Sequence, residues 1–167
     1  MRLFFTQLFV SERKQIAMIA DEKSPARISH RIFATSRSEK EIIMQKVIST
    51  KRAPGAIGPY SQAIEINNIV FTSGVIPVNP ATGEIAEGVE AQAEQAFENL
   101  CHLVEDSGSK VENIVKTTVF IKEMNDFGKI NEIYKKYFKE PFPARSCVEV
   151  ARLPKDVLLE VEAIAWK

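Results

Sequence analysis

The sequence predicts a single layered α+β domain. Its 167 residues suffice for one domain with a sizeable core and are too few for two ordinary domains. The composition, 45% hydrophobic and 26% charged, is typical of a soluble globular protein. Strand-like segments come first along the chain, and two segments with helical periodicity are spaced among later strands. This order of elements favours helices packed against a sheet in an α+β arrangement.

Six strands are expected from runs of alternating or β-branched residues. In chain order they cover residues 45–49, 60–66, 69–73, 114–121, 144–150 and 158–166. Asn67-Asn68 joins the second and third strands, because asparagine tolerates the positive φ of a tight hairpin turn. Residues 51–59 form a loop rich in glycine and proline, and residues 79–83 contain a second turn.

Two helices are expected from apolar residues at helical spacing. The first carries Ala93, Ala96, Phe97, Leu100 and Val104, and Gly108 is placed where that helix would end. The second begins after Asp126, which is expected to cap it, and its apolar stripe consists of Ile130, Ile133, Tyr134 and Tyr137.

The first 43 residues differ from the rest of the chain. They contain no glycine and carry an excess of basic over acidic residues, and Met44 then opens a segment that resembles a normal protein start. We therefore divide the chain into a weakly structured extension, 1–43, and a domain, 44–167. The extension is either a targeting leader or translated upstream sequence, and the expected location is cytoplasmic, or organellar if it is a presequence.

Charge and cysteine content exclude several classes of protein. The formal net charge is zero, with 22 basic and 22 acidic residues, so no global attraction to nucleic acid or membrane is expected. The two cysteines, Cys101 and Cys147, lie far apart without a CxxC pair, as in a reduced intracellular protein without a zinc site.

Arg145 is the most informative single residue, because a guanidinium inside an apolar-leaning strand needs a partner. Alternation places it on one face with Cys147 and Glu149, and Glu160 and Glu162 share a face of the next strand. We expect the two strands to bring these charges to one side of the sheet. Two interpretations remain open: a cross-strand Arg–Glu pair, or an anion-binding cleft with a carboxylate beside it for proton transfer.

Other candidates come from short motifs. Pro59 would make Tyr60 project from a defined position; the alternative, which this feature alone favours, is a turn with Tyr60 packed on the core. Ser73 and Gly74 end a strand on small residues that let a backbone approach a ligand, or they mark a simple transition to a loop. The Asn131 amide would reach the domain interior or the surface, and Arg145 would lower the thiol pKa of Cys147.

From about Met44 onward the sequence resembles the RidA (YjgF) family of reactive-intermediate deaminases. The resemblance covers nearly the whole domain in the family's order. It is carried by APGAIGPYSQA (53–63), FTSGVIPVNPATGEI (71–85), VKTTVFIKEMNDF (115–127), FPARSCVEVARLPKD (142–156) and EVEAIA (160–165).

The resemblance implies a chorismate-mutase-like fold, a mixed sheet with two helices on one face, assembled as a homotrimer with clefts between subunits. It also implies hydrolysis of 2-iminobutanoate and 2-iminopropanoate to 2-keto acids and ammonia without cofactor or metal, which protects pyridoxal-phosphate enzymes. By motif, Arg145 would clamp the substrate carboxylate and Glu160 would activate water. The remaining cleft residues by motif are Tyr60, Ser73, Gly74, Asn131 and Cys147.

Two alternatives stay open beside deamination. Members of the family have also been described as endoribonucleases or translation inhibitors, but zero net charge and the lack of a basic, aromatic stripe argue against strong RNA binding. The other alternative is a non-enzymatic ligand sensor or holdase, which would use the same clefts.

Overall fold

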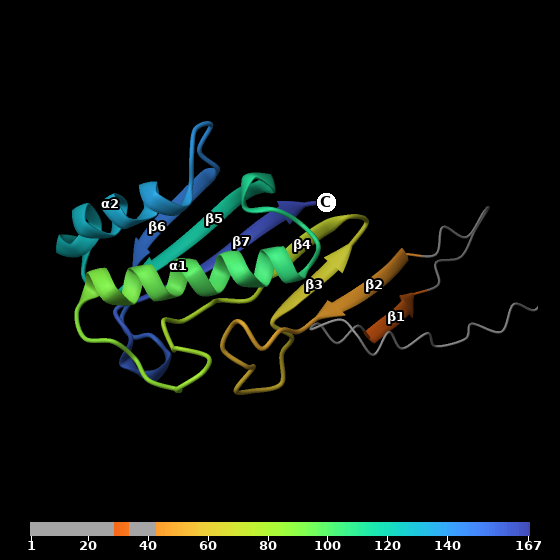
Figure 1. The fold of residues 1–167 in the computed structure, drawn as a ribbon, viewed down its shortest axis with the longest axis horizontal. Coiled ribbons are helices and arrows are strands. Elements are labelled where there is room, and N and C mark those ends of the chain that lie inside the picture. Colours follow the sequence, from red (N-terminus) through yellow and green to blue (C-terminus); the bar gives the residue numbers. More distant parts are fainter. Residues whose placement is uncertain (1–28, 34–42) are drawn as a thin grey trace, which may run out of the picture.

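A seven-stranded mixed sheet forms the framework of the molecule (Figure 1). The structure is a computed structural model that describes residues 29–33 and 43–167. The strands are β1 (Ser29–Phe33), β2 (Ile43–Ile48), β3 (Ala63–Ile66), β4 (Ile69–Thr72), β5 (Ile114–Ile121), β6 (Ala144–Glu149) and β7 (Leu159–Trp166). Their order across the sheet is β1-β2-β3-β4-β7-β5-β6, so the last strand of the chain lies in the middle. Only β5 and β6 run parallel.

Helices α1 (Val89–Asp106) and α2 (Phe127–Tyr137) cover one face of the sheet (Figure 1). The core lies between them and this face, with Phe97 and Leu100 of α1 packed in one cluster with Val119 of β5 and Val161 of β7. Both strands alternate, so their other residues point to the opposite face, which no helix covers. None of the helices in the described residues is long and apolar enough to cross a membrane.

The expected elements are present, with differences at their ends. Strand β5 has the predicted bounds, and Asn67 and Asn68 adopt positive φ angles of 48° and 61° between β3 and β4. Residues 60–62, expected in a strand, belong instead to the preceding loop. Asp126 directly precedes α2 but its side chain does not cap it, because the carboxylate binds Lys129 Nζ at 3.2 Å.

Five residues of the predicted extension form a strand. Strand β1 pairs antiparallel with β2, from Ser29 opposite Val47 to Phe33 opposite Ile43. It therefore becomes the outer strand of the sheet on that side. The expectations for residues 1–28 and 34–42 lie outside the described residues, and the division of the chain after residue 43 stays a prediction.

Candidate functional site

The Arg145 guanidinium lies on the helix-covered face, over aromatic rings of α2. Its central carbon is 4.6 Å from the centre of the Tyr134 ring and 5.5 Å from that of Phe127. Within the described part of the chain Arg145 has no salt-bridge partner, and Glu149 on the same face accepts a hydrogen bond from the Met124 N–H instead. Cation–π contacts thus hold a guanidinium whose donors remain available for an anion.

Tyr134 supports the Arg145 guanidinium, although sequence reasoning placed it only in an apolar stripe. The residue is buried, and its hydroxyl shares a 2.9 Å hydrogen bond with the Thr117 hydroxyl. Thr117 lies directly opposite Arg145 in the β5–β6 ladder. Burial raises the pKa of Tyr134, with the Thr117 hydrogen bond and Arg145 acting in the opposite direction. The sequence signal for this cation–π contact would have been a tyrosine in the apolar stripe of a helix together with an arginine on a strand.

A cavity of 320 Å³ opens beside Arg145. Asn131 lines it, so the amide of the second helix does reach this region as one interpretation expected. The complete lining is Asn131, Tyr134, Lys135, Phe142, Pro143 and Arg145. The cavity joins a planar cation to a neutral amide, a combination suited to binding a carboxylate.

Cys147 lies two residues after Arg145 on the same face of β6. Strand β6 lies at the end of the sheet, and the Val150 N–H donates to Ile121 of β5 at 2.9 Å. Because successive backbone groups alternate in direction, the N–H groups of Arg145 and Cys147 point away from β5, toward the open edge. The expected lowering of the Cys147 thiol pKa is wrong: burial raises it, and the opposing effect of Arg145 is smaller. Cys147 therefore contributes a backbone donor and no thiolate.

Glu160 lies on the other face of the sheet, against the backbone of Gly74. A side chain at Gly74 would collide with the Glu160 carboxylate, so only glycine fits there in this arrangement. Burial raises the pKa of the Glu160 carboxyl, and repulsion from Glu162 raises it further. Gly74, just after β4, leaves space for the Glu160 carboxylate. The motif alone had indicated only that a backbone could approach a ligand there.

A second cavity of 320 Å³ lies in front of this carboxylate. Its lining consists of Ile57, Tyr60, Ser73, Gly74, Ile76, Pro154 and Glu160. Tyr60 is 46% exposed, so the alternative that packs it on the core is wrong. The Ser73 hydroxyl donates to the Ser61 carbonyl at 2.7 Å. Tyr60, Ser73, Gly74 and Glu160 thus lie around one cavity.

The two groups lie on opposite faces of the sheet, which corrects the expectation of charges on one side. Arg145 pairs with Thr117, Thr117 pairs with Ala163, and Glu160 is three residues before Ala163 on β7. The register separates their Cα atoms by roughly 10 Å across the sheet and roughly 10 Å along it. Strand β5 lies between their strands, so the alternative of a cross-strand Arg–Glu pair is also wrong.

No cluster in the described residues has the three histidine, cysteine or acidic side chains that a metal site needs. Cys101 is buried in α1, and desolvation raises its pKa to about 12, so its thiol stays protonated. The chemistry available here is that of a guanidinium, a carboxylate and backbone donors.

Comparisons with known proteins match most of the chain. The family described as Endoribonuclease L-PSP matches residues 50–167. The 2-iminobutanoate/2-iminopropanoate deaminase of Escherichia coli (strain K12) is 57% identical over 125 residues, 73% of this chain and 98% of that protein. RutC family protein PM1466 of Pasteurella multocida is 59% identical over 128 residues, 74% of this chain and 99% of that one. A crystal structure of E. coli TdcF with bound serine, 55% identical, superposes with a TM-score of 0.70 over 72% of this chain and 98% of its own.

Proposed function

Because the chain belongs to the Endoribonuclease L-PSP (RidA/YjgF) family, we propose that it hydrolyses small 2-imino acids to 2-keto acids and ammonia. The observation that carries the proposal is the presence of two half-sites in one chain. One presents the Arg145 guanidinium on its aromatic platform, and the other presents the Glu160 carboxylate with a raised pKa. We extend the proposal to the imines named in the relatives, 2-iminobutanoate and 2-iminopropanoate. We also propose that their removal protects pyridoxal-phosphate enzymes.

The half-sites of one subunit are too far apart to act on one small molecule. In a 2-imino acid the carboxylate and the imine carbon are adjacent, whereas Arg145 and Glu160 project from opposite faces of the sheet. A complete site therefore requires the Arg145 group of one copy to meet the Glu160 group of another. Such a head-to-tail contact closes into a ring, and we propose a homotrimer with three equivalent clefts.

The uncovered face of the sheet supports this assembly. Large apolar side chains are exposed on it or beside it, among them Phe71 at 41%, Val148 at 42% and Trp166 at 52%. Exposed apolar area of this kind is typical of a protein–protein contact. Burying it between copies would remove it from water and would bring the Glu160 face toward a neighbour.

The carboxylate of the substrate would bind at the Arg145 half-site. The planar guanidinium offers two parallel hydrogen bonds, and Asn131 and the Cys147 N–H supply further polar groups nearby. The serine bound to TdcF carries a carboxylate, which supports an amino-acid-like ligand for this chain as well. Fixing the carboxylate orients the adjacent imine carbon toward the other half-site.

Glu160 would act as general base and then as general acid. It removes a proton from water as the water oxygen bonds to the imine carbon, and it returns the proton to the nitrogen. In the adduct formed from the protonated imine, the C–N bond then breaks as the hydroxyl oxygen forms the C=O bond of the keto acid. Ammonia leaves with the bonding electron pair, and the hydroxyl proton passes to the Glu160 carboxylate and from there to ammonia or solvent. A carboxyl pKa raised toward neutrality suits both transfers. Tyr60, Ser73 and Gly74 would line the cleft around the water.

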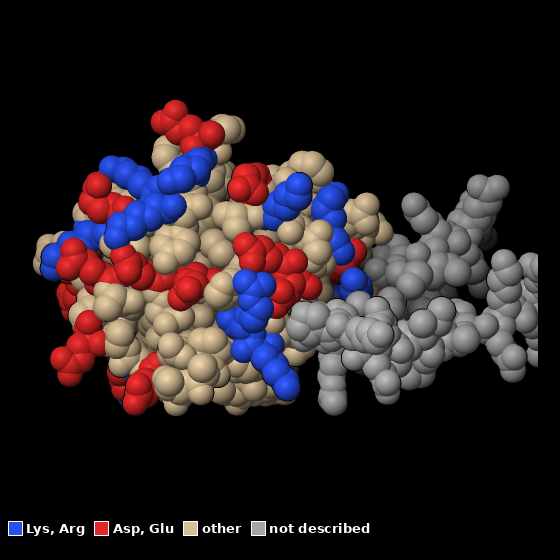
Figure 2. Space-filling view, viewed as in Figure 1, with Lys and Arg blue, Asp and Glu red and all other residues tan. Residues whose placement is uncertain are grey.

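Cleavage of RNA is the activity that the family's description names, and the charge distribution does not favour it. The face shown in Figure 2 intersperses acidic and basic side chains without a continuous basic stripe. Binding to a phosphate backbone depends on such basic contacts, because counterion release supplies much of the affinity. We therefore propose deamination and expect no RNA cleavage by the purified protein.

Mixing two inactive variants tests both the reaction and the shared site. Arg145→Ala lacks one half-site and Glu160→Gln the other, so each alone should release almost no 2-ketobutyrate from 2-iminobutanoate generated by a threonine dehydratase. In mixed trimers roughly one cleft in four combines the two intact halves, so about a quarter of the activity should return. If the wild-type protein releases no 2-ketobutyrate, the proposed deaminase activity is refuted. Inactive mixed trimers beside an active wild type would refute the shared site.

A further inference from the structure

The side chain of Gln62 connects the two ends of the loop that carries Tyr60. Gln62 is 7% exposed and is the last residue of the loop between β2 and β3. Its Oε1 accepts the Thr50 N–H at 2.7 Å. Its Nε2 donates to the carbonyls of Thr50, Ala53 and Pro54 at 3.1, 3.3 and 2.8 Å. One amide thus holds the beginning of the loop against its end.

The backbone of Gln62 connects the same loop to the Glu160 half-site. Its carbonyl accepts the Ser73 N–H at 2.9 Å, and the Ser73 hydroxyl donates to Ser61. Ser73 precedes Gly74, on which the Glu160 carboxylate rests. Hydrogen bonds between Ser73 and residues 61–62 therefore connect the loop directly to the cavity in front of Glu160.

Tyr60 depends on this loop for its position. Its ring is exposed, and its hydroxyl accepts a hydrogen bond of 3.3 Å from the Ile57 N–H inside the loop. Core packing does not fix such a side chain, whereas a well-held backbone can. The position of Tyr60 in the cavity is therefore set by the hydrogen bonds that hold residues 50–62.

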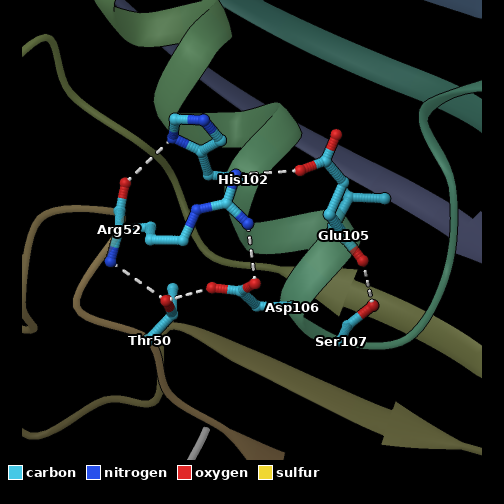
Figure 3. A network of polar contacts seen from close by, with 7 residues as sticks. Thr50, Arg52, His102, Glu105, Asp106 and Ser107 are labelled. Carbon is cyan, nitrogen blue, oxygen red and sulfur yellow. Dashed lines mark hydrogen bonds and ion pairs between the residues drawn. The ribbon is translucent and has the colours of Figure 1, made fainter. Parts of the chain in front are cut away.

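A second set of contacts fastens the loop to α1 from outside (Figure 3). Arg52 binds Asp106 at 2.9 Å and Glu105 at 3.0 Å. The Thr50 hydroxyl also binds Asp106, and His102 Nδ1 lies 3.3 Å from the Arg52 carbonyl. The Arg52 and Glu105 side chains are more than 40% exposed, and such an exposed ion pair contributes little to stability. The Asp106 side chain is only 9% exposed, but it keeps the Thr50 hydroxyl as a partner when the Arg52 side chain is removed. Removing a buried amide whose groups are all hydrogen-bonded costs more stability, so Gln62 holds the loop more strongly than Arg52 does.

We propose that Gln62 is a positioning residue for the imine-hydrolysing cleft, acting through the backbone of residues 50–62 to hold Tyr60 beside Glu160. The inference rests on the proposed function. An amide is suited to this place because it offers an acceptor to the Thr50 N–H and donors to three carbonyls at once. A leucine would fill a similar volume and satisfy none of these groups.

The test compares Gln62→Leu with Arg52→Ala, which cuts only the outer fastening. Gln62→Leu should lower kcat/KM about tenfold or more, because four backbone groups lose their partner, and Arg52→Ala should stay close to wild type. The loss should also be non-additive with Tyr60→Ala, because both changes remove the same positioned ring. Additive losses, or equal effects of Gln62→Leu and Arg52→Ala, would overturn the proposal.

Hydrogen exchange provides a measurement that does not depend on activity. The Thr50 amide donates directly to Gln62, so its protection should fall in Gln62→Leu while amides of the central strands β5 and β7 keep theirs. Wild type without deaminase activity would refute the proposed function, and the exchange data would still test the loop. If Gln62→Leu does not assemble, Gln62→Asn replaces it in the test. Its amide is too short to reach the same groups, so the exchange protection of the Thr50 amide should fall. Unchanged protection at Thr50 in the variant that assembles would overturn the proposal.

Discussion

The guanidinium of Arg145 is stacked on Tyr134, with 4.6 Å between the guanidinium carbon and the ring centre. The two residues come from different elements, β6 and α2, and the contact forms only when the helix packs on the sheet. The Tyr134 hydroxyl is in turn held by Thr117, the ladder neighbour of Arg145. The guanidinium is thereby oriented, and no carboxylate of residues 29–33 or 43–167 forms a salt bridge with it that would compete with the proposed substrate.

This stacking predicts different effects for two substitutions of Tyr134. Tyr134→Phe keeps the ring, so the affinity for 2-ketobutyrate should stay near wild type, while the buried Thr117 hydroxyl loses its partner and stability falls by about 1 kcal/mol. Tyr134→Leu removes the ring, and the affinity should fall about fivefold, as expected for about 1 kcal/mol of cation–π energy. Titration calorimetry and thermal unfolding measure the two effects. Equal affinity in the leucine variant would show that the ring does not support the arginine.

The roles proposed for the two charged residues can be separated by conservative changes. Arg145→Lys keeps the charge but loses the planar fork, so 2-ketobutyrate should bind weakly. Glu160→Gln keeps the shape but removes the base, so kcat should fall about a hundredfold or more while 2-ketobutyrate still binds. Calorimetry of both variants and a keto-acid assay measure these outcomes. A wild-type rate in Arg145→Lys would make the arginine structural, and full activity in Glu160→Gln would place water activation elsewhere.

The contact between Gly74 and Glu160 predicts a steric effect on activity. In Gly74→Ala the new methyl group would meet the carboxylate, so the side chain must move and kcat should drop by about tenfold or more. Gly55→Ala is the matched control, because a Cβ there meets nothing within 4 Å. Both variants should remain folded, as judged by thermal unfolding. Equal activity in both would show that the position of the Glu160 carboxylate is not critical.

Repulsion from Glu162 predicts a shift in the pH dependence of the reaction. Glu160 must be ionised to accept a proton, so kcat/KM should rise with pH through its pKa. Burial raises this pKa first, and Glu162 raises it further. Glu162→Gln removes a negative charge, which makes ionisation of Glu160 easier and lowers its pKa. The acidic limb of the profile should therefore move to lower pH, and an unmoved limb would show that another group controls it.

Removal of residues 1–43 should leave the domain folded and assembled. Every residue of the main core cluster lies between Ile48 and Ala165, so truncation removes none of it. Among the described residues, the truncation removes β1 and the first residue of β2, Ile43, and it breaks the β1–β2 pairing and leaves an edge of β2 exposed. Gel filtration and thermal unfolding should give the same oligomer and nearly the same Tm as the full chain. A truncated protein that is insoluble or monomeric would show that the extension is structural.

Local patterns predicted most of the elements because the forces behind them are local. Strand β5 was expected with its observed bounds, since its alternation follows from one face being buried. The positive φ angles of Asn67 and Asn68 follow from the side-chain chemistry of asparagine. Residues 60–62 were misplaced in a strand because Gln62 bonds to backbone groups of residues 50–54, which alternation does not reveal.

The sequence by itself predicted the class of fold and the alternation of the strands, because periodicity and turn chemistry are properties of short segments. Its motifs also named most of the residues proposed for the two half-sites, but not Tyr134. Only the tertiary structure decided which of these residues lie together. It inserted β5 between β6 and β7, which separates Arg145 from Glu160, and the register of these strands placed the two side chains on opposite faces of one sheet. Strand order depends on contacts between segments far apart in the chain, and alternation within each strand is compatible with several such orders.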